Sequence, residues 1–253
     1  MSGHAALNPV SALLPFSVDG AGSSGGNLLV FAGRPRYALR MDRREILAGC
    51  RLYGIVDMGY VSPDHAEEAA AALIRGGVRI LQLRAKGMPE EDVRMLAYRL
   101  QPLCCEAGCI FIVNDYPEIA MECGADGVHV GQDDGALKEV RKMVGEGMLV
   151  GRSTHSPEQA LAAHAEGADY IGFGPLFPTG TKPGRPAIGL DDVCRVGEAL
   201  GDSPVFCIGG INGGSLDRVL EHGARRVVIV SWLLLHEDPA GAARDVIQKL
   251  EGR

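Results

Sequence analysis

The sequence predicts a closed (β/α)₈ barrel, an α/β fold built on an eight-stranded parallel sheet. Eight short apolar runs alternate with eight segments of helical periodicity from residue 51 onward. The runs are continuously apolar, as expected for strands that are buried on both faces. About 200 residues is the small end of the range for such a barrel. A doubly wound open sheet is the alternative, but the even spacing of the repeats favours closure.

The elements follow in a regular order along the chain. The predicted strands are residues 52–57, 79–84, 110–115, 127–131, 149–154, 170–174, 205–210 and 226–231. The predicted helices are residues 64–75, 89–107, 116–122, 135–144, 156–166, 190–200, 213–222 and 239–251.

The first residues differ from the repeats. A glycine- and serine-rich run at 20–26 is typical of a flexible linker, and Met41 begins a segment that resembles a natural protein start. We expect residues 1–43 to be a disordered or non-native extension. Residues 44–253 are expected to form the catalytic barrel domain.

Composition excludes several classes of function. The net charge of −7 argues against a general binder of nucleic acid or membrane surfaces. The sequence contains no run of about 18 apolar residues, which is the length that a membrane-spanning helix requires. The seven cysteines are odd in number and form no CxxC pair, which argues against a disulfide framework or a zinc cluster. We expect a cytoplasmic protein that binds small molecules, and a homo-oligomer is compatible with the sequence.

Polar side chains gather at one end of the predicted barrel. The carboxyl ends of the strands carry Gln82, Arg84, Lys86, Asn114, Asp115, Gln132, Asp134, Ser153, His155, Thr179 and Lys182. The opposite ends mostly follow Gly-Ala or Gly-Gly turns. Barrel enzymes place their active sites at the carboxyl ends of the strands, so this asymmetry predicts an enzyme.

The second strand ends in two cations. Alternation places Gln82, Arg84 and Lys86 on one face, where Arg84 and Lys86 are suited to grip a polyphosphate. A solvated strand end is the alternative interpretation.

Two aspartates follow the next strands. Asp115 and Asp134 come from neighbouring strand ends, and Mg²⁺ typically binds one or two carboxylates together with substrate phosphates. Asp133 is a rival ligand to Asp134. The structural alternative is that Asp115 and Asp134 are helix N-caps.

Hydroxyls mark the later strand ends. The Ser153 hydroxyl is a candidate hydrogen-bond donor to a phosphate oxygen, with Thr154, His155 and Ser156 as alternatives. Ser156, however, is typical of a helix cap before Pro157. His129 falls inside a strand and is expected to be a packed, hydrogen-bonded core residue.

Two anion sites are predicted, one assisted by a metal at strands two to six and one without a metal at strands seven and eight. Thr179, Thr181 and Lys182 follow the sixth strand, where a solvated turn is the alternative. Gly209 and Gly210 follow the seventh strand and allow a phosphate to approach the main chain. Two anion sites indicate two phosphorylated substrates.

The chain from about 51 to 252 resembles the thiamine phosphate synthase family. The motifs that carry the resemblance are QLRAK (82–86), ND (114–115), ADGVHVGQDD (125–134), GRSTHS (151–156), GADYIGFGPLFPTGTK (167–182), IGGI (208–211) and VS (230–231). The resemblance implies a (β/α)₈ barrel transferase of thiamine biosynthesis that requires Mg²⁺. It implies that the pyrimidine of 4-amino-2-methyl-5-hydroxymethylpyrimidine diphosphate is joined to 4-methyl-5-(2-hydroxyethyl)thiazole phosphate by a dissociative route, with release of pyrophosphate.

The same resemblance assigns roles to residues of this chain. It implies that Asp115 and Asp134 hold one Mg²⁺ per active site. The residues implied to contact the pyrimidine diphosphate are Gln82, Leu83, Arg84, Ala85, Lys86, Asn114, Ser153 and Lys182, of which Arg84, Lys86, Ser153 and Lys182 are catalytic. Those implied to hold the thiazole phosphate are Thr179, Gly180, Thr181, Gly210, Val230 and Ser231.

Some positions depart from the family pattern. Asp133 replaces a usual Glu, Tyr116 replaces a common basic residue, and Trp232 is bulkier than the usual residue beside the thiazole phosphate. One alternative is a metal-independent thiazole tautomerase of the same fold, which Pro175 and the two aspartates argue against. The other is a non-catalytic protein that binds thiamine intermediates.

Overall fold

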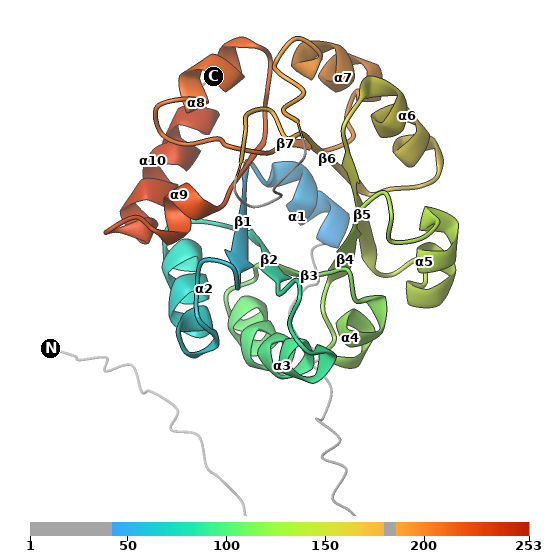
Figure 1. Ribbon diagram of the computed structural model, residues 1–253, viewed down its shortest axis with the longest axis vertical. Helices are drawn as coiled ribbons and strands as arrows, with labels where there is room; N and C mark the ends of the chain where they lie inside the picture. The colour runs from blue at the N-terminus through green and yellow to red at the C-terminus, as the bar shows by residue number, and fades with distance from the viewer. Residues whose placement is uncertain (1–41, 180–185, 253) are drawn as a thin grey trace, which may run out of the picture. The chain divides into compact units, whose positions relative to one another are not determined.

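The predicted barrel is confirmed by a computed structural model, which describes residues 42–179 and 186–252. Each strand pairs in parallel with the next, and β8 pairs with β1 to close the ring (Figure 1). The strands are β1 (Leu52–Asp57), β2 (Ile80–Arg84), β3 (Ile110–Asn114), β4 (Gly127–Val130), β5 (Leu149–Thr154), β6 (Tyr170–Phe173), β7 (Val205–Cys207) and β8 (Val227–Ile229). Residues 1–41 of the predicted extension, and the site residues Gly180, Thr181 and Lys182, lie outside the described residues.

Helices alternate with the strands and surround them in Figure 1. They are η1 (Pro63–His65), α2 (Ala66–Arg75), α3 (Glu90–Glu106), α4 (Pro117–Glu122), α5 (Leu137–Val144), α6 (Pro157–Ala165), α7 (Val193–Leu200), α8 (Leu216–Glu221) and α10 (Pro239–Glu251). Two further helices, α1 (Arg43–Gly49) and α9 (Ser231–Leu234), have no counterpart in the sequence-based assignment.

The strands bury both of their faces, which explains their continuous apolar runs. In β3, Phe111 and Val113 pack in the cluster formed with the helices, whereas Ile110 and Ile112 pack in the barrel interior. This period-2 alternation fixes which side chains reach the interior and the mouth of the barrel.

The greatest difference from the predicted boundaries lies after β7. The strand ends at Cys207 rather than at residue 210, because Gly209 and Gly210 take positive φ angles of 99° and 66°. Helix α8 begins at Leu216 rather than at residue 213. Before it, the Asn212 side chain accepts hydrogen bonds from the backbone N–H groups of Gly214 and Ser215 in a local turn.

Helix α1 closes the amino-terminal end of the barrel. Its Leu47 and the adjoining Cys50 are buried among interior residues such as Tyr53 and Ile80. Asp42 caps the helix by accepting a hydrogen bond from the Arg44 N–H. In Figure 1, α1 lies within the ring of strands.

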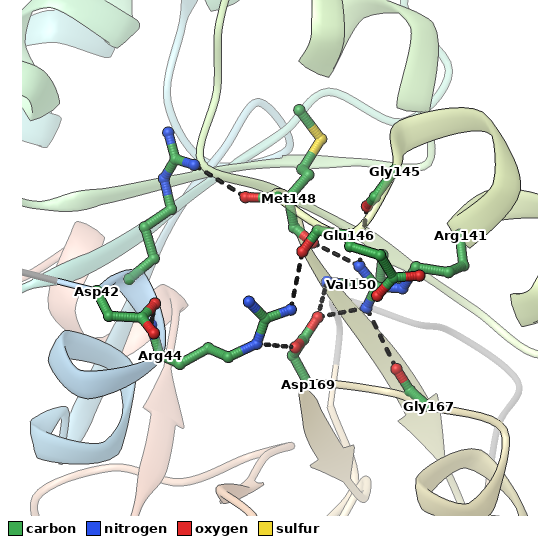
Figure 2. Close-up of polar contacts among 11 residues, drawn as sticks. Asp42, Arg44, Arg141, Gly145, Glu146, Met148, Val150, Gly167 and Asp169 are labelled. Carbon is green, nitrogen blue, oxygen red and sulfur yellow. Dashed lines mark hydrogen bonds and ion pairs between the residues drawn. The ribbon is translucent and has the colours of Figure 1, made fainter.

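Ion pairs hold α1 in this position. Arg43 Nε donates to Asp126 Oδ1 at 2.6 Å, and Arg44 Nε donates to Asp169 Oδ1 at 2.8 Å. Figure 2 shows Asp169 between Arg44 and Arg141, and Asp169 Oδ2 also accepts from the Val150 N–H at 2.8 Å. Because Asp126 and Asp169 immediately precede β4 and β6, these contacts lie at the end opposite the predicted site.

In the part of the chain that the structure describes, no helix combines the length and the apolar character that a membrane crossing requires.

Candidate active site

Arg84, the last residue of β2, is fixed by a carboxylate that sequence analysis did not single out. Its Nη1 donates to Asp57 Oδ2 at 2.8 Å, and Asp57 is 1% exposed at the end of the neighbouring strand β1. The other carboxylate oxygen of Asp57 accepts from the Gly59 N–H. The signal that could have identified Asp57 is its position at a strand end, which it shares with Asn114 and Asp115. The pair holds the guanidinium at the mouth of the barrel.

Lys86 and Asp115 form the next ion pair around the mouth. Lys86 Nζ lies 3.2 Å from Asp115 Oδ2. Asp115 has a φ of 66°, and no other non-glycine residue among those described has a positive φ. Such a conformation costs energy and is often found at functional sites. This conformation changes the direction of the chain directly after β3. The Asp115 N–H still donates to the His129 carbonyl of β4 at 2.9 Å.

The Asp115 and Asp134 carboxylates are neighbours, as predicted for a metal site. Burial, followed by the nearby Asp134 carboxylate, raises the pKa of Asp115 above its ordinary value, and Lys86 opposes this shift. Neither aspartate is a helix N-cap, since Tyr116 caps α4 and Ala136 caps α5. The two carboxylates offer oxygen ligands of the kind that Mg²⁺ prefers, and a divalent cation between them would relieve their repulsion.

The loop that carries Asp134 is held by β5. Arg152 Nη1 donates to the Gly135 carbonyl at 2.8 Å, and Gln132 Nε2 donates to the Ser153 carbonyl at 2.6 Å. Asp134 Oδ2 accepts from the Gly131 N–H at 2.7 Å. Within the described residues there is no cluster of three or more His, Cys, Asp or Glu side chains suited to a metal. An ion held by these two carboxylates would keep coordination positions open for substrate oxygens and water.

Alternation also separates the residues of the QLRAK motif. Gln82 lies in the interior and is 2% exposed, and it shares the wall of a cavity of about 40 Å³ with Arg84 and Asn114. Leu83 and Ala85 point the other way and pack in the cluster formed with the helices. Any contact that these two residues make with a substrate therefore has to come from their backbone.

The hydroxyls after β5 have distinct positions. Ser153 lines the interior cavity and the larger cavity at the mouth. Thr154 is fully buried and donates to the Gly172 carbonyl, and Ser156 caps α6, as predicted. His155 Nδ1 contacts the Gly174 carbonyl, and its side chain lines the larger cavity. Ser153 and His155 are thus the candidates from this segment that reach the mouth.

The larger cavity, of about 390 Å³, opens at the ends of β6, β7 and β8. Its lining is mostly apolar side chains and glycine backbone: Ser153, His155, Gly172, Gly174, Pro175, Pro178, Thr179, Ile208, Gly209, Gly210, Ile211, Asn212, Val228, Val230, Ser231, Trp232 and Leu235. The predicted residues Thr179, Gly210, Val230 and Ser231 are therefore brought together.

Glycine is required at the floor of this cavity. A Cβ at Gly209 would lie 2.4 Å from Pro175 Cα, and a Cβ at Gly210 would lie 2.7 Å from Phe177 Cβ. The two loops are joined because the Phe177 N–H donates to the Gly209 carbonyl at 3.0 Å. A backbone without side chains allows a phosphate to approach closely.

Helix α9 adds a first turn beside the two glycines. It begins at Ser231, directly after Val230, and the N–H groups of a helix's first turn favour anions. Trp232 packs over Gly213 and meets His236 edge to face, with ring centroids 5.3 Å apart. The bulky residue noted in the sequence therefore forms part of the cavity wall.

His129 is buried and hydrogen-bonded, as predicted. Its Nδ1 lies 3.2 Å from the Tyr170 hydroxyl and its Nε2 lies 2.9 Å from Ser153 Oγ. The Tyr53 and Tyr170 hydroxyls, 3.0 Å apart in the interior, were not anticipated, because each tyrosine sits in an apolar run that reads as ordinary core.

Comparisons with known proteins identify similar chains. Residues 52–233 match the family model described as thiamine monophosphate synthase. A thiamine-phosphate synthase of Thermus thermophilus is 48% identical over 189 residues, which are 75% of this chain and 89% of that protein. One from Mycobacterium tuberculosis is 45% identical over 211 residues, covering 79% of this chain and 94% of that protein.

A solved structure shares the fold. The thiamine phosphate pyrophosphorylase from Pyrococcus furiosus superposes with a TM-score of 0.73 and 28% identity, covering 82% of this chain and 98% of that one.

Proposed function

The chain belongs to the thiamine monophosphate synthase family, and from that premise we propose how its two groups of mouth residues divide the work. The activity is that of a thiamine-phosphate synthase, a transferase that joins the pyrimidine of 4-amino-2-methyl-5-hydroxymethylpyrimidine diphosphate to 4-methyl-5-(2-hydroxyethyl)thiazole phosphate. Thiamine phosphate and pyrophosphate are the products.

The charged side of the mouth is proposed to bind the pyrimidine diphosphate. Arg84 and Lys86 stand at the end of β2, and Asn114 and Ser153 face the same interior. Lys182, which lies outside the described residues, is the third proposed cation. In a dissociative course the bond between the pyrimidine methylene carbon and the diphosphate oxygen breaks first. Fixed cations then stabilise the negative charge that grows on the leaving group.

Asp115 and Asp134 are proposed to hold one Mg²⁺ per active site. The single observation that carries the proposal is that the two carboxylates lie side by side, with Lys86 next to Asp115. When bound, the ion would supply positive charge to the diphosphate oxygens.

The neutral side of the mouth is proposed to bind the thiazole phosphate. Gly210, Val230 and Ser231 line the larger cavity, together with Thr179. Gly180 and Thr181, outside the described residues, complete the proposed set. Holding the thiazole nitrogen near the methylene carbon removes the entropic cost of their meeting.

We also propose a cytoplasmic location. All seven cysteines are free, which is typical of proteins in a reducing compartment.

The test mixes both substrates with the protein and Mg²⁺ and measures thiamine phosphate and pyrophosphate. We expect both products in equal amounts, and a chelator should abolish them. Reactions that lack one substrate serve as controls. A tautomerase would instead isomerise a thiazole carboxylate phosphate in the presence of chelator, and a binding protein would retain both substrates without turnover. Either result would overturn the proposal.

A further inference from the structure

Five polar side chains form a continuous hydrogen-bonded line across the barrel interior, which we call the interior chain: Gln82, Tyr53, Tyr170, His129 and Ser153. Gln82 Nε2 donates to the Tyr53 hydroxyl at 2.7 Å, and the two tyrosine hydroxyls are 3.0 Å apart. Tyr170 then lies 3.2 Å from His129 Nδ1, and His129 Nε2 lies 2.9 Å from Ser153 Oγ. The line runs from β2 through β1, β6 and β4 to β5.

The rest of the barrel is shaped to accommodate this line. Tyr53, Gln82 and Tyr170 are each no more than 2% exposed. A Cβ at Gly151 would lie 2.1 Å from the Tyr170 ring, so only glycine leaves room for that tyrosine. Buried polar groups are costly unless they are paired, and each of these side chains is paired with the next.

The chemistry of the first member gives the line a direction. An amide nitrogen donates and does not accept, so the Tyr53 oxygen accepts from Gln82 and its own proton is available to Tyr170. In that direction, Tyr170 in turn would donate to His129 Nδ1. A neutral imidazole that accepts at Nδ1 carries its proton on Nε2, and this proton is donated to Ser153 Oγ.

We propose that the interior chain holds His129 as the Nε2–H tautomer and thereby turns the Ser153 hydroxyl proton outward, as a donor to the leaving diphosphate. Ser153 is the catalytic residue of this set, whereas His129, Tyr170 and Tyr53 are positioning residues. The inference rests on the proposed function, because that function places Ser153 at the diphosphate.

The direction matters because a serine hydroxyl has only one proton. If Ser153 donated that proton to the imidazole, its oxygen would face the diphosphate as an acceptor, and two electron-rich oxygens would repel each other. With the imidazole as donor, the serine proton strengthens its bond as charge grows on the leaving group. The carbonyl of Ser153 is held separately by Gln132, so only the hydroxyl orientation depends on His129.

The first test reads the tautomer without any substrate. In ¹⁵N NMR of the full chain, the imidazole resonances missing from a His129→Gln variant identify His129 among the seven histidines. We expect a protonated Nε2 and an unprotonated Nδ1. A protonated Nδ1 in the neutral ring would reverse the line and overturn the inference. The tautomer itself is read from the wild-type protein, and the His129→Gln variant serves only to assign the resonances.

The second test is a double-mutant cycle on turnover. We expect Ser153→Ala to lower kcat by about 100-fold, and Tyr170→Phe to lower it by about tenfold through misorientation of the hydroxyl. In the Ser153→Ala background, Tyr170→Phe should change kcat by less than about twofold, because the group that it positions is gone. The matched control is Tyr98→Phe, which removes a tyrosine hydroxyl on the outer helix α3 and should leave kcat unchanged.

The outcomes separate the two proposals. Unchanged turnover in Ser153→Ala would overturn the placement of Ser153 at the diphosphate, and the inference with it. A large loss in Ser153→Ala with none in Tyr170→Phe would overturn the inference alone. Equal losses from Tyr170→Phe in both backgrounds would show a purely structural tyrosine and would also overturn it.

Discussion

The two sides of the barrel mouth are built from different materials. At the ends of β1 to β4, charged side chains meet in pairs, Arg84 with Asp57 and Lys86 with Asp115. At the ends of β6 to β8, the larger cavity is lined by apolar side chains and by glycines with positive φ. In the proposed reaction, the first side faces an anion whose charge grows, and the second faces a phosphate that does not react. Charged side chains are suited to stabilise the negative charge that grows on the leaving diphosphate. Backbone N–H groups are sufficient to bind the thiazole phosphate, whose charge does not change in the reaction.

This contrast predicts a kinetic division. Changes on the charged side should reduce kcat, because they remove interactions that strengthen in the transition state. Changes on the neutral side should raise the KM for thiazole phosphate and leave kcat nearly unchanged. The four changes below are ordered by the size of the effect that we expect.

The largest effect is expected from Asp115→Asn. Loss of one carboxylate from the proposed ion site should lower kcat on the order of 1,000-fold and weaken the dependence of the rate on Mg²⁺. Pyrophosphate release measured over a range of Mg²⁺ concentrations checks this. The matched control is Asp133→Asn, next to Asp134, which should behave like the wild type. A control as damaged as the variant would make Asp133 the ligand.

Arg84→Ala should lower kcat by roughly 100-fold while the KM for thiazole phosphate changes little. The variant also leaves Asp57 buried without its ion-pair partner, which should lower the free energy of unfolding by about 3–5 kcal/mol. Steady-state kinetics with each substrate varied, together with denaturant unfolding, measure both effects. Equal changes in kcat and in thiazole phosphate affinity would contradict the division between the two sides.

Gly210→Ala tests the neutral side of the mouth. A Cβ there would meet Phe177 and Pro178 at a φ of 66°, so the loop has to shift. We expect the KM for thiazole phosphate to rise about tenfold, equivalent to about 1.4 kcal/mol, with kcat within twofold. Gly214→Ala in the same segment is the control, since its nearest contact would be 3.4 Å away. A drop in kcat at unchanged KM would break the comparison.

The smallest kinetic effect is expected at the opposite end of the barrel. Asp169→Asn weakens the contacts of Arg44 and Arg141, and should lower the free energy of unfolding by about 1–3 kcal/mol without changing kcat or KM. Thermal or denaturant unfolding measures the loss. Asp217→Asn, which affects an exposed pair with Lys249, should change stability by less than about 0.5 kcal/mol. Altered kinetics in Asp169→Asn would mean that the two ends of the barrel are coupled.

Periodicity in the sequence was sufficient to predict the barrel and the side of each strand that faces inward. It separated Gln82 and Arg84 from Leu83 and Ala85, and it placed Asp115 and Asp134 on adjacent strands. The first of these predictions depends on the period of two within a strand. The second depends on the order of the strands, which a repeating βα pattern determines.

Other features depend on contacts between distant residues, and the sequence did not reveal them. Asp57 matters because Arg84 lies opposite it, and that pairing spans two strands. Helix α1 contacts the barrel through its arginines, which pair with Asp126 and Asp169, 83 and 125 residues away. Tyr53 and Tyr170 are 117 residues apart. No local pattern carries such pairings.

Helix α1 makes the barrel interior a blind pocket rather than a channel. Leu47 and Cys50 are 1% and 3% exposed, so α1 and the residue that follows it are buried against this end of the interior. We therefore expect protons of the buried hydroxyls and of the His129 ring to exchange with bulk water mainly through the mouth. A bound substrate should therefore slow the exchange of these protons, and their exchange rate should report whether the active site is occupied.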